Sequence, residues 1–213
     1  MYRELLLGCG YRRERLVDPY TWSDNFAVAT AHVRDEVGWE RWQHVVTVDR
    51  NPDCAPDYVM DLAGDWRLRS NYLVPLEHEE LWDPLPYRRF KDAIFDEVHA
   101  YEVLEHLGQQ GDEVAFFRHF ESIWRVLKVG GFLCATVPSR YSPWLWGDPG
   151  HRRAILPVTL YFLRQTHYRY QVGRGPSSDY RSIYAGNFHI VHSADNEETH
   201  TFVLQALPPE PER

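Results

Sequence analysis

The stretch ELLLGCG, residues 4–10, joins an apolar run directly to two glycines. An apolar run that ends in a turn signal is typical of a buried strand followed by a tight turn. Three later runs have the same character, and the first two of them end in an acid: HVVTVDRN (44–51), PDYVMDLAGD (56–65) and DAIFDEVHAYE (92–102). A fifth strand is expected at FLCATVPS (132–139), where a proline ends it.

Helical patterns stand between and after these strands. The clearest helix is DEVAFFRHFESIWRVLKVGG (112–131), which Asp112 can cap and which a pair of glycines can end. EVLEHLG (102–108) and ILPVTLYFLRQTHY (155–168) are also predicted to be helical. Buried strands that alternate with helices predict an α/β fold with a doubly wound, mainly parallel sheet.

The C-terminal part predicts an antiparallel addition to this sheet. In NFHIVHSADNEETHTFVLQA (187–206), two β-rich runs flank a polar turn, as in a hairpin. We expect one domain over residues 1–207 and a flexible tail over 208–213. The long connections 11–43 and 64–91 are expected to contain helices and lids over a site.

The charge balance bears on the partners. Lys and Arg total 23 against 31 Asp and Glu, a net charge of −8, and a duplex nucleic acid would require a basic face. The basic clusters Arg12-Arg13-Arg15 and Arg152-Arg153 are interpreted as solvated surface. A small-molecule partner is therefore expected ahead of nucleic acid. The histidines of the hairpin alternate, so His189, His192 and His200 are also expected at the surface.

Three widely spaced cysteines, Cys9, Cys54 and Cys134, show no pairing pattern. An odd, unpatterned number of thiols is typical of a reducing compartment, so a cytoplasmic location is expected. No apolar run approaches the length of a membrane span, and no membrane partner is expected.

Small and acidic residues follow the predicted strands at the edge of a parallel sheet where ligands bind. Gly8 and Gly10 allow close approach of a ligand to the backbone, and Asp49 can accept both hydroxyls of a ribose. These are the demands of an adenosine-bearing cofactor. The NAD fingerprint does not fit, because Arg13 stands at the third glycine and Asp49 lies far beyond the required roughly 20 residues.

The motifs LLLGCG, VTVDRN, MDLAGD, YEVLEHL and LKVGGFLCATVPS follow one another in order over roughly residues 4–140. Through these five motifs the chain resembles the class I S-adenosylmethionine-dependent methyltransferases. The resemblance implies a Rossmann-like methyltransferase fold, S-adenosylmethionine as cofactor and an enzyme that transfers a methyl group. It says little about the methyl acceptor.

The same resemblance implies roles for residues at the strand ends. The glycine turn would cradle the methionine part of the cofactor, the end of the second strand would hold the ribose, the end of the third would contact adenine, and the end of the fourth would accept the ammonium. The implied cofactor-binding residues are Gly8, Cys9, Gly10, Asp49, Arg50, Asp61, Leu62, Tyr101 and Glu102. The chain departs from the family at Leu6, where an acid is usual, and Glu14 is a candidate substitute.

In EVLEHL, a helix would place Glu102, Glu105 and His106 on one face. Two carboxylates and an imidazole suit a divalent cation, magnesium or manganese. The pattern is similar to that of the small-RNA 3′-terminal 2′-O-methyltransferases, in which these residues bind magnesium together with a histidine after the fifth strand. His151 in GDPGHRR stands at that place. The alternative is that these side chains only shape the pocket wall.

The stretch WLWGDPGHRRAI (144–155) lies where the family places acceptor loops. Asp148 and His151 are candidates for an oriented acid/base pair, with His106 as a third catalytic candidate. Trp144 and Trp146 would stack on a flat acceptor, unless they are core residues of a simple turn.

Three functions follow in order of preference. The first is methyl transfer to a small-molecule or modest polar acceptor. The second is metal-assisted 2′-O-methylation of an RNA 3′ end, which the glutamates and histidines favour and the acidic balance opposes. The third is a non-catalytic cofactor-binding or partner-binding module, which the departures from the family at Leu6 and Arg13 favour.

Overall fold

The computed structural model describes residues 2–11, 13–21, 41–42, 44–64, 66, 76–83 and 89–210. Most of the helices and lids expected in the two long connections lie outside these residues. The described parts of the connections contain two 3-10 turns, η1 (Pro19–Thr21) and η3 (Leu76–Leu81).

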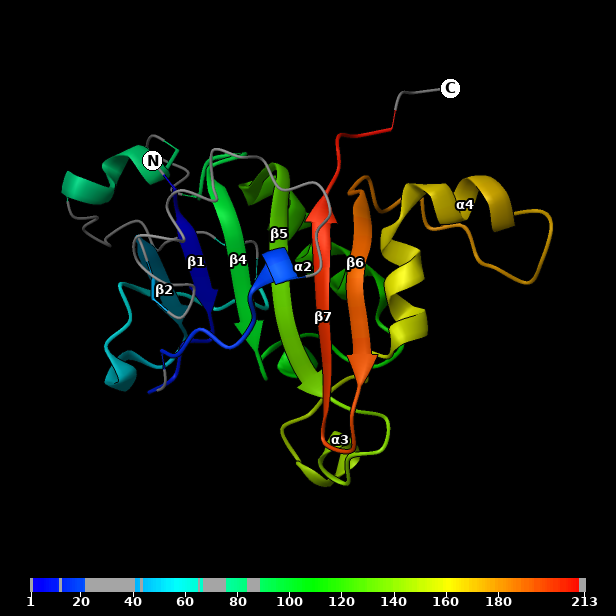
Figure 1. Cartoon of the computed structure of the whole chain (residues 1–213), viewed down its shortest axis with the longest axis horizontal. Helices are drawn as coiled ribbons and strands as arrows, with labels where there is room; N and C mark the ends of the chain where they lie inside the picture. The colour runs from blue at the N-terminus through cyan, green and yellow to red at the C-terminus, as the bar shows by residue number, and fades with distance from the viewer. Residues whose placement is uncertain are drawn as a thin grey trace.

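The described residues form a seven-stranded sheet in the order β3-β2-β1-β4-β5-β7-β6 (Figure 1). The first five strands along the chain are parallel, whereas β7 is antiparallel to both β5 and β6. The predicted α/β fold, with its mainly parallel sheet and C-terminal hairpin, is confirmed. The strands are β1 (Glu4–Leu7), β2 (Val45–Asp49), β3 (Tyr58–Val59), β4 (Phe95–Tyr101), β5 (Leu127–Pro138), β6 (Phe188–Asp195) and β7 (Thr199–Ala206).

The helices differ from the predicted ones at their ends. Asp112 caps α2 (Glu113–Val126), and its carboxylate accepts a hydrogen bond from Ala115 N at 2.9 Å. The predicted end at the two glycines is wrong, because Leu127 is already extended and begins β5. The remaining helical elements are short: η2 (Pro52–Cys54), η4 (Leu104–His106), α3 (Trp144–Gly147), η5 (Pro157–Leu163) and α4 (Gln165–Gln171).

One face of the sheet packs on a large apolar core. Alternate residues of β1 and β4 meet α2, which lies behind the sheet in Figure 1. These core residues include Leu5, Leu7, Val98, Ala100, Phe117, Phe120 and Ile123. Because this face buries the apolar area, it supplies most of the hydrophobic stabilisation of the fold.

The opposite face carries a buried ionic network beneath the segment 13–21, which crosses the front of the sheet in Figure 1. Glu97 is fully buried and accepts from Arg15 and from His99 Nε2, the latter at 2.7 Å. Glu4 joins the same network, with its carboxylate 3.3 Å from the Arg15 guanidinium. The interpretation of Arg15 as solvated surface is therefore wrong, because two buried carboxylates hold its charge.

The hairpin also corrects one surface expectation. His189 is exposed and His192 half-buried, but His200 is fully buried. Its Nδ1 lies 3.0 Å from the carbonyl of Ile155 and its Nε2 lies 2.9 Å from the Ser193 hydroxyl. Both ring nitrogens have partners, so His200 is a satisfied structural residue.

The glycine turn after β1 is required by packing. Gly8 has a φ of +60°, and a Cβ added there would lie 2.4 Å from Val103 Cγ2. We expect Gly8→Ala to destabilise the protein by roughly 2–5 kcal/mol, because the left-handed conformation and the overpacking both oppose a side chain. Gly10→Ala is the matched control, since Gly10 also has a positive φ but no atom of the described residues lies within 4 Å of an added Cβ. It should lose only about 1–2 kcal/mol. Urea denaturation of both variants measures the difference, and equal losses would contradict the packing argument.

None of the helices in the described part of the chain has the length and apolar composition needed to cross a bilayer.

Candidate functional site

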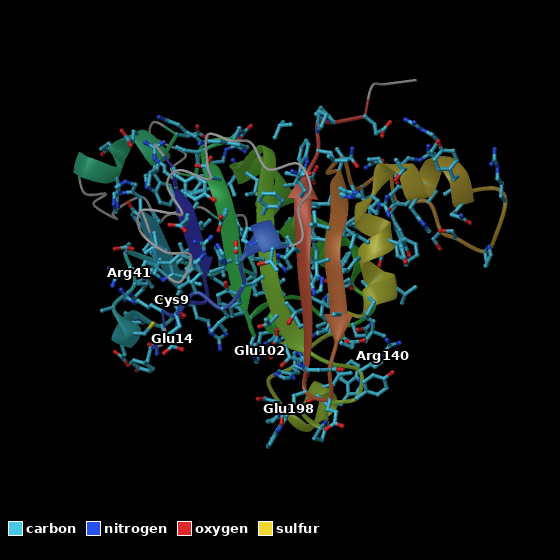
Figure 2. The ribbon with its side chains drawn as sticks, in the orientation of Figure 1. Cys9, Glu14, Arg41, Glu102, Arg140 and Glu198 are labelled. Atoms are coloured by element: carbon cyan, nitrogen blue, oxygen red, sulfur yellow. The ribbon has the colours of Figure 1, made fainter. Side chains whose placement is uncertain are left out.

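The carboxyl ends of the parallel strands meet at one edge of the sheet, the lower edge in Figure 2. Cys9 lies there below the end of β1, and Glu102 lies below the end of β4. The tip of the β6–β7 hairpin, marked by Glu198, reaches the same edge. Residues from three distant parts of the sequence therefore border one site.

The end of β2 is tied to the glycine turn. Asp49 Oδ2 accepts a hydrogen bond from Gly10 N at 2.9 Å, and Oδ1 accepts one from Asn51 N at 2.8 Å. Asp49 is half-exposed and Arg50 is exposed. Because each carboxylate oxygen has two lone pairs, Asp49 keeps acceptor capacity for hydroxyl groups while its orientation is held by backbone donors.

The residues after β3 are placed differently from one another. Asp61 is exposed, and its Oδ1 accepts from Ala63 N at 3.0 Å. Leu62 is buried in the apolar core, and its carbonyl accepts from Trp66 Nε1 at 3.2 Å. At this edge Asp61 is therefore the residue of the pair whose side chain remains available to a ligand.

The end of β4 turns sharply. The Tyr101 side chain is directed into the ionic network, where its hydroxyl lies 2.6 Å from His99 Nδ1 and accepts from the N–H groups of Leu16 and Val17. Glu102 has a φ of +52°, and its N–H donates to Thr136 O at 2.9 Å. A non-glycine residue in this region is strained, and such strain concentrates at functional sites.

Glu105, His106 and His151 come together at this edge. A carboxylate oxygen of Glu105 and one ring nitrogen of each histidine all lie within 4.8 Å of one another. Glu105 Oε1 is 3.9 Å from His106 Nε2 and 3.8 Å from His151 Nε2. The two rings stand edge to face, with centroids 4.7 Å apart.

The histidines are oriented by backbone carbonyls. His106 Nδ1 lies 3.0 Å from Gly150 O, and His151 Nδ1 lies 3.3 Å from Leu145 O. If each Nδ1 carries the proton, each Nε2 presents a lone pair toward Glu105. This is how metal-binding histidines are held in other proteins, with the second ring nitrogen donating to a carbonyl.

The Glu105 side chain is fully buried, and among the described residues no other side chain forms a hydrogen bond with either of its carboxylate oxygens. Burial raises the pKa of Glu105 to about 8, and the nearby carboxylates of Glu102 and Asp148 add to the rise. A buried carboxylate without a partner is costly. Its presence between two imidazoles therefore suggests a positively charged ligand.

The prediction that a helix places Glu102, Glu105 and His106 on one face is wrong in part. Glu102 lies outside any helix, and only Leu104–His106 form a 3-10 turn. Glu105 and His106 nevertheless meet His151, because the N–H groups of Arg152 and Arg153 both donate to Glu105 O. Glu102 is not within the close group of three. It borders the adjoining cavity instead, where lost hydration raises its pKa.

That cavity has a volume of about 290 Å³ and opens beside His151. Asp148 Oδ2 lies 3.8 Å from His151 Nε2, too far for a hydrogen bond, and Asp148 Oδ1 accepts from Gly150 N at 2.6 Å. The proposed acid/base pair is thus not formed in this geometry. The lining residues are Glu102, Pro138, Ser142, Trp144, Asp148, His151, Glu198 and Thr199.

The tryptophans of the acceptor stretch lie at the surface. Trp144 is 65% exposed and Trp146 is 59% exposed, whereas Leu145 between them is buried. The alternative that they are core residues is wrong, so both rings are free to contact a flat group.

Sequence reasoning missed Glu198, Thr199 and Ser142 at this cavity. Glu198 and Thr199 reach it because β7 pairs with β5, with Pro138 opposite Thr199 and Ser139 N donating to Glu198 O at 2.9 Å. The sequence predicted the hairpin but carried no signal for the strand beside which it lies.

Arg153 was also misread as solvated surface. Its guanidinium is buried and donates to the carbonyls of Leu107, Gln109 and Asp112, at 3.1, 2.6 and 2.9 Å. Together with the bond from Arg153 N to Glu105 O, these contacts hold the chain from Glu105 to the start of α2.

We expect Arg153→Ala to lower the free energy of unfolding by about 3 kcal/mol, because three buried carbonyls lose a charged donor. Arg152→Ala is the matched control, since the neighbouring side chain is exposed and its loss should stay within about 0.5 kcal/mol. Denaturant titration of both variants measures the two losses. A small effect of Arg153→Ala would show that the hydrogen bonds of its guanidinium do not stabilise this part of the chain.

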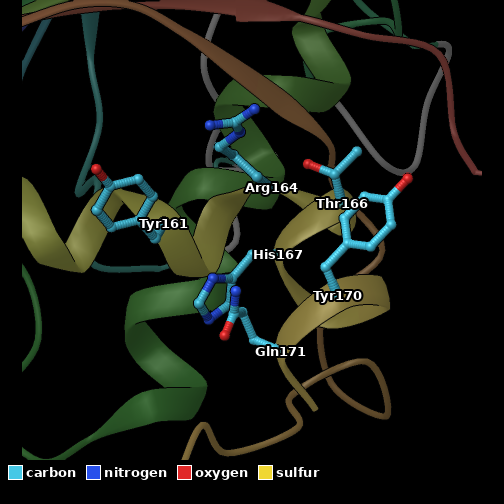
Figure 3. A pocket seen from close by; sticks show the side chains of 6 residues that line it. All are labelled: Tyr161, Arg164, Thr166, His167, Tyr170 and Gln171. Atoms are coloured by element: carbon cyan, nitrogen blue, oxygen red, sulfur yellow. The ribbon is translucent and has the colours of Figure 1, made fainter. Parts of the chain in front are cut away.

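A second cavity, of about 380 Å³, lies on η5 and α4 and shares no residue with the edge site (Figure 3). It is lined by Tyr161, Arg164, Thr166, His167, Tyr170 and Gln171.

No protein-family model matches the chain, and no curated protein is similar to it in sequence. Among solved structures, a SAM-dependent methyltransferase from Archaeoglobus fulgidus is 13% identical, with 96% of this chain and 86% of that chain covered and a TM-score of 0.47. One from Mesorhizobium loti is 13% identical, with 95% and 90% covered and a TM-score of 0.47.

The 1,6-didemethyltoxoflavin-N1-methyltransferase of Burkholderia thailandensis, with 1,6-didemethyltoxoflavin and S-adenosylhomocysteine bound, is 14% identical, with 97% of this chain and 71% of that chain covered and a TM-score of 0.47. At identities and TM-scores of this size, the chemistry of the chain has to be inferred from its own residues.

Proposed function

We propose that this protein is an S-adenosylmethionine-dependent methyltransferase that methylates a hydroxyl group with the help of a divalent cation. The observation that carries the proposal is the fully buried Glu105 carboxyl group, which faces two oriented imidazoles and has no side-chain hydrogen-bond partner within the described part of the chain. The cluster lies at the same sheet edge as the glycine turn and Asp49. A donor and an acceptor bound at these two places would be neighbours.

On the donor side, the glycine turn would approach the methionine part of the cofactor and Asp49 would accept the ribose hydroxyls. Asp61 would contact the adenine, and the backbone at Tyr101 and Glu102 would accept the ammonium group. S-adenosylmethionine supplies a methyl group that is already activated, so the protein has to bind and orient rather than activate the donor.

On the acceptor side, Glu105, His106 and His151 fit a magnesium or manganese ion, with Glu102 as a further ligand from the adjoining cavity. Carboxylate oxygens suit both ions, whereas the two imidazoles favour the transition metal manganese over magnesium. The buried carboxyl group would gain a positively charged partner. A bound divalent cation lowers the pKa of a hydroxyl group at its open position. Asp148 lies at the cavity rim, where it would take up the released proton, and the exposed tryptophans would stack on a flat acceptor.

A small molecule with neighbouring hydroxyls is our first acceptor class, because the net charge of −8 disfavours a polyanion. The 3′-terminal ribose of an RNA is the second candidate. It is favoured by the similarity of the set Glu102, Glu105, His106 and His151 to that of the small-RNA 2′-O-methyltransferases. Both classes present vicinal hydroxyls to the same centre.

The donor half is tested by thermal shift with S-adenosylhomocysteine. Ligand binding to the native state raises the melting temperature by mass action, and Asp49→Asn should abolish most of this rise. Asp53→Asn is the matched control, because Asp53 is an exposed acid four residues away. If S-adenosylhomocysteine gives no shift with the unaltered chain, a non-catalytic module is the better reading.

The acceptor half is tested by methyl transfer to catechol and to a short single-stranded RNA, each with and without manganese. Manganese-dependent methylation of catechol supports the small-molecule class. Methylation of the RNA that disappears when its 3′-terminal 2′-hydroxyl is already methylated supports the second class. Equal activity with manganese and with excess chelator would show that the reaction needs no cation.

A further inference from the structure

Two thiols that are 45 positions apart in the sequence meet beside the proposed donor site. Cys9 belongs to the glycine turn after β1, and Cys54 ends η2, the 3-10 turn after β2. Both sulfur atoms and a carboxylate oxygen of Asp49 lie within 4.8 Å of one another. Both cysteines are free thiols, so no disulfide links them in this structure.

The pair is enclosed but close to the surface. Cys9 is 3% exposed and Cys54 is 7% exposed, and they pack together with Leu6. The Cys54 thiol donates to Asn51 O at 3.0 Å. Arg13 donates to Cys54 O at 2.9 Å and to Ala55 O at 2.5 Å, which holds η2 against the segment after the glycine turn.

Burial and the neighbouring groups keep the Cys9 thiol protonated. Burial raises the pKa of the Cys9 thiol to about 11, and Cys54 and Asp49 add to the rise, while Arg13 opposes it. The Cys9 thiol is therefore protonated at neutral pH and reacts slowly, because the thiolate is the reactive form.

We propose that Cys9 and Cys54 are a disulfide-forming pair, and that their oxidation by a low-molecular-weight disulfide closes the donor site. The disulfide would link the glycine turn after β1 to η2. The effect on donor binding rests on the proposed function, whereas the formation of the disulfide does not.

The chemistry is two successive exchanges. The thiolate of Cys54, the more exposed of the two, attacks one sulfur of glutathione disulfide, which forms a mixed disulfide and releases one glutathione thiolate. The thiolate of Cys9 then attacks the Cys54 sulfur, which forms the Cys9–Cys54 bond and releases the second glutathione. Two protein thiols are oxidised, one glutathione disulfide is reduced to two thiols, and the protons of the cysteines end on the two glutathiones.

The expected consequence follows from the position of Asp49. Its carboxylate lies beside both sulfurs and is held by Gly10 N and Asn51 N, one donor from each of the two loops. A covalent bond between the loops draws them together around this carboxylate, because disulfide sulfurs lie only about 2 Å apart. Hydroxyl groups would then lose access to Asp49.

A soft cation is the rival occupant, because two thiolates and a carboxylate are also metal ligands. Zinc sites of this kind need a fourth ligand or an open position. No further Cys, His, Asp or Glu joins this group among the described residues. A disulfide needs only the two sulfurs, so we favour it.

The test uses the full chain, reduced and then incubated with glutathione disulfide. We expect an intact mass lower by two hydrogen atoms, a linked peptide that contains Cys9 and Cys54, and S-adenosylhomocysteine affinity lower by roughly tenfold or more. Dithiothreitol should restore the affinity. Cys134→Ala removes the remaining thiol and should leave the linked peptide unchanged, whereas Cys54→Ala should prevent it.

Other outcomes overturn the proposal. If the sole product is a mixed disulfide with glutathione, or a link that includes Cys134, then Cys9 and Cys54 are not a disulfide-forming pair. A thiolate absorption band with cadmium in the absence of any disulfide would assign the site to a soft cation. A Cys9–Cys54 link with unchanged S-adenosylhomocysteine affinity would show that the disulfide does not regulate donor binding. If the reduced protein binds no S-adenosylhomocysteine at all, the proposed function fails while the peptide map still decides on the disulfide.

Discussion

Replacing Glu105 with glutamine should abolish cation-dependent methyl transfer, with a loss of rate on the order of 100-fold or more. Glutamine keeps the shape of the side chain beside His106 and His151 but cannot offer a bound cation the negative charge of a carboxylate. The measurement compares the manganese dependence of the rate in the unaltered protein and in the variant. Glu113→Gln, an exposed carboxylate in the first turn of α2, is the matched control and should keep full activity.

A variant Glu105→Gln that still binds manganese and methylates at the original rate would show that the cluster is a pocket wall. Loss of activity with unchanged manganese affinity would instead place Glu105 in the binding of the acceptor. The two results separate the alternatives that the sequence left open for this residue.

The same substitution should stabilise the metal-free protein at alkaline pH. The pKa of Glu105 is about 8 in the folded state, against an ordinary value of 4.5. Between these values the folded state keeps a proton that the unfolded state has released, so stability falls as the pH rises through the window. Glutamine does not titrate, so the gain should be near zero at pH 4.5 and on the order of 4 kcal/mol above pH 8.

Urea denaturation in the presence of a chelator, at both ends of this window, measures the gain. Addition of manganese should reverse the order of stability, because only the unaltered protein binds the ion. A difference between the two proteins that does not change with pH would contradict the burial of an uncompensated carboxylate at this position.

The sequence was sufficient for the strands but not for the turns between them. Apolar runs such as ELLLGCG and FLCATVPS are buried by the sheet wherever it lies, so their pattern is local. The stretch 102–108 was read as a helix from its spacing, yet Glu102 adopts a positive φ and only a 3-10 turn follows. The N–H of Glu102 donates to Thr136 O, and Glu105 O accepts from the N–H groups of Arg152 and Arg153. No local pattern encodes these long-range contacts.

The candidate site was accessible to sequence reasoning only where a motif marked it. His151 was found because a family pattern expects a histidine after the fifth strand. Arg153 and Glu198 were missed, since buried arginines and hairpin tips look like surface in a sequence. The proximity of Cys9 to Cys54 was also missed, because it depends on the parallel register of β1 and β2.

The position of β7 has a consequence for the order of synthesis. This strand is late in the chain but lies between β5 and β6, where it covers the free edge of β5. While the chain is being translated, β5 is therefore an open edge that can pair with another molecule until residues 199–206 have left the ribosome. Because Glu198 and Thr199 arrive with that strand, the wall of the site is completed only after most of the sheet has been made.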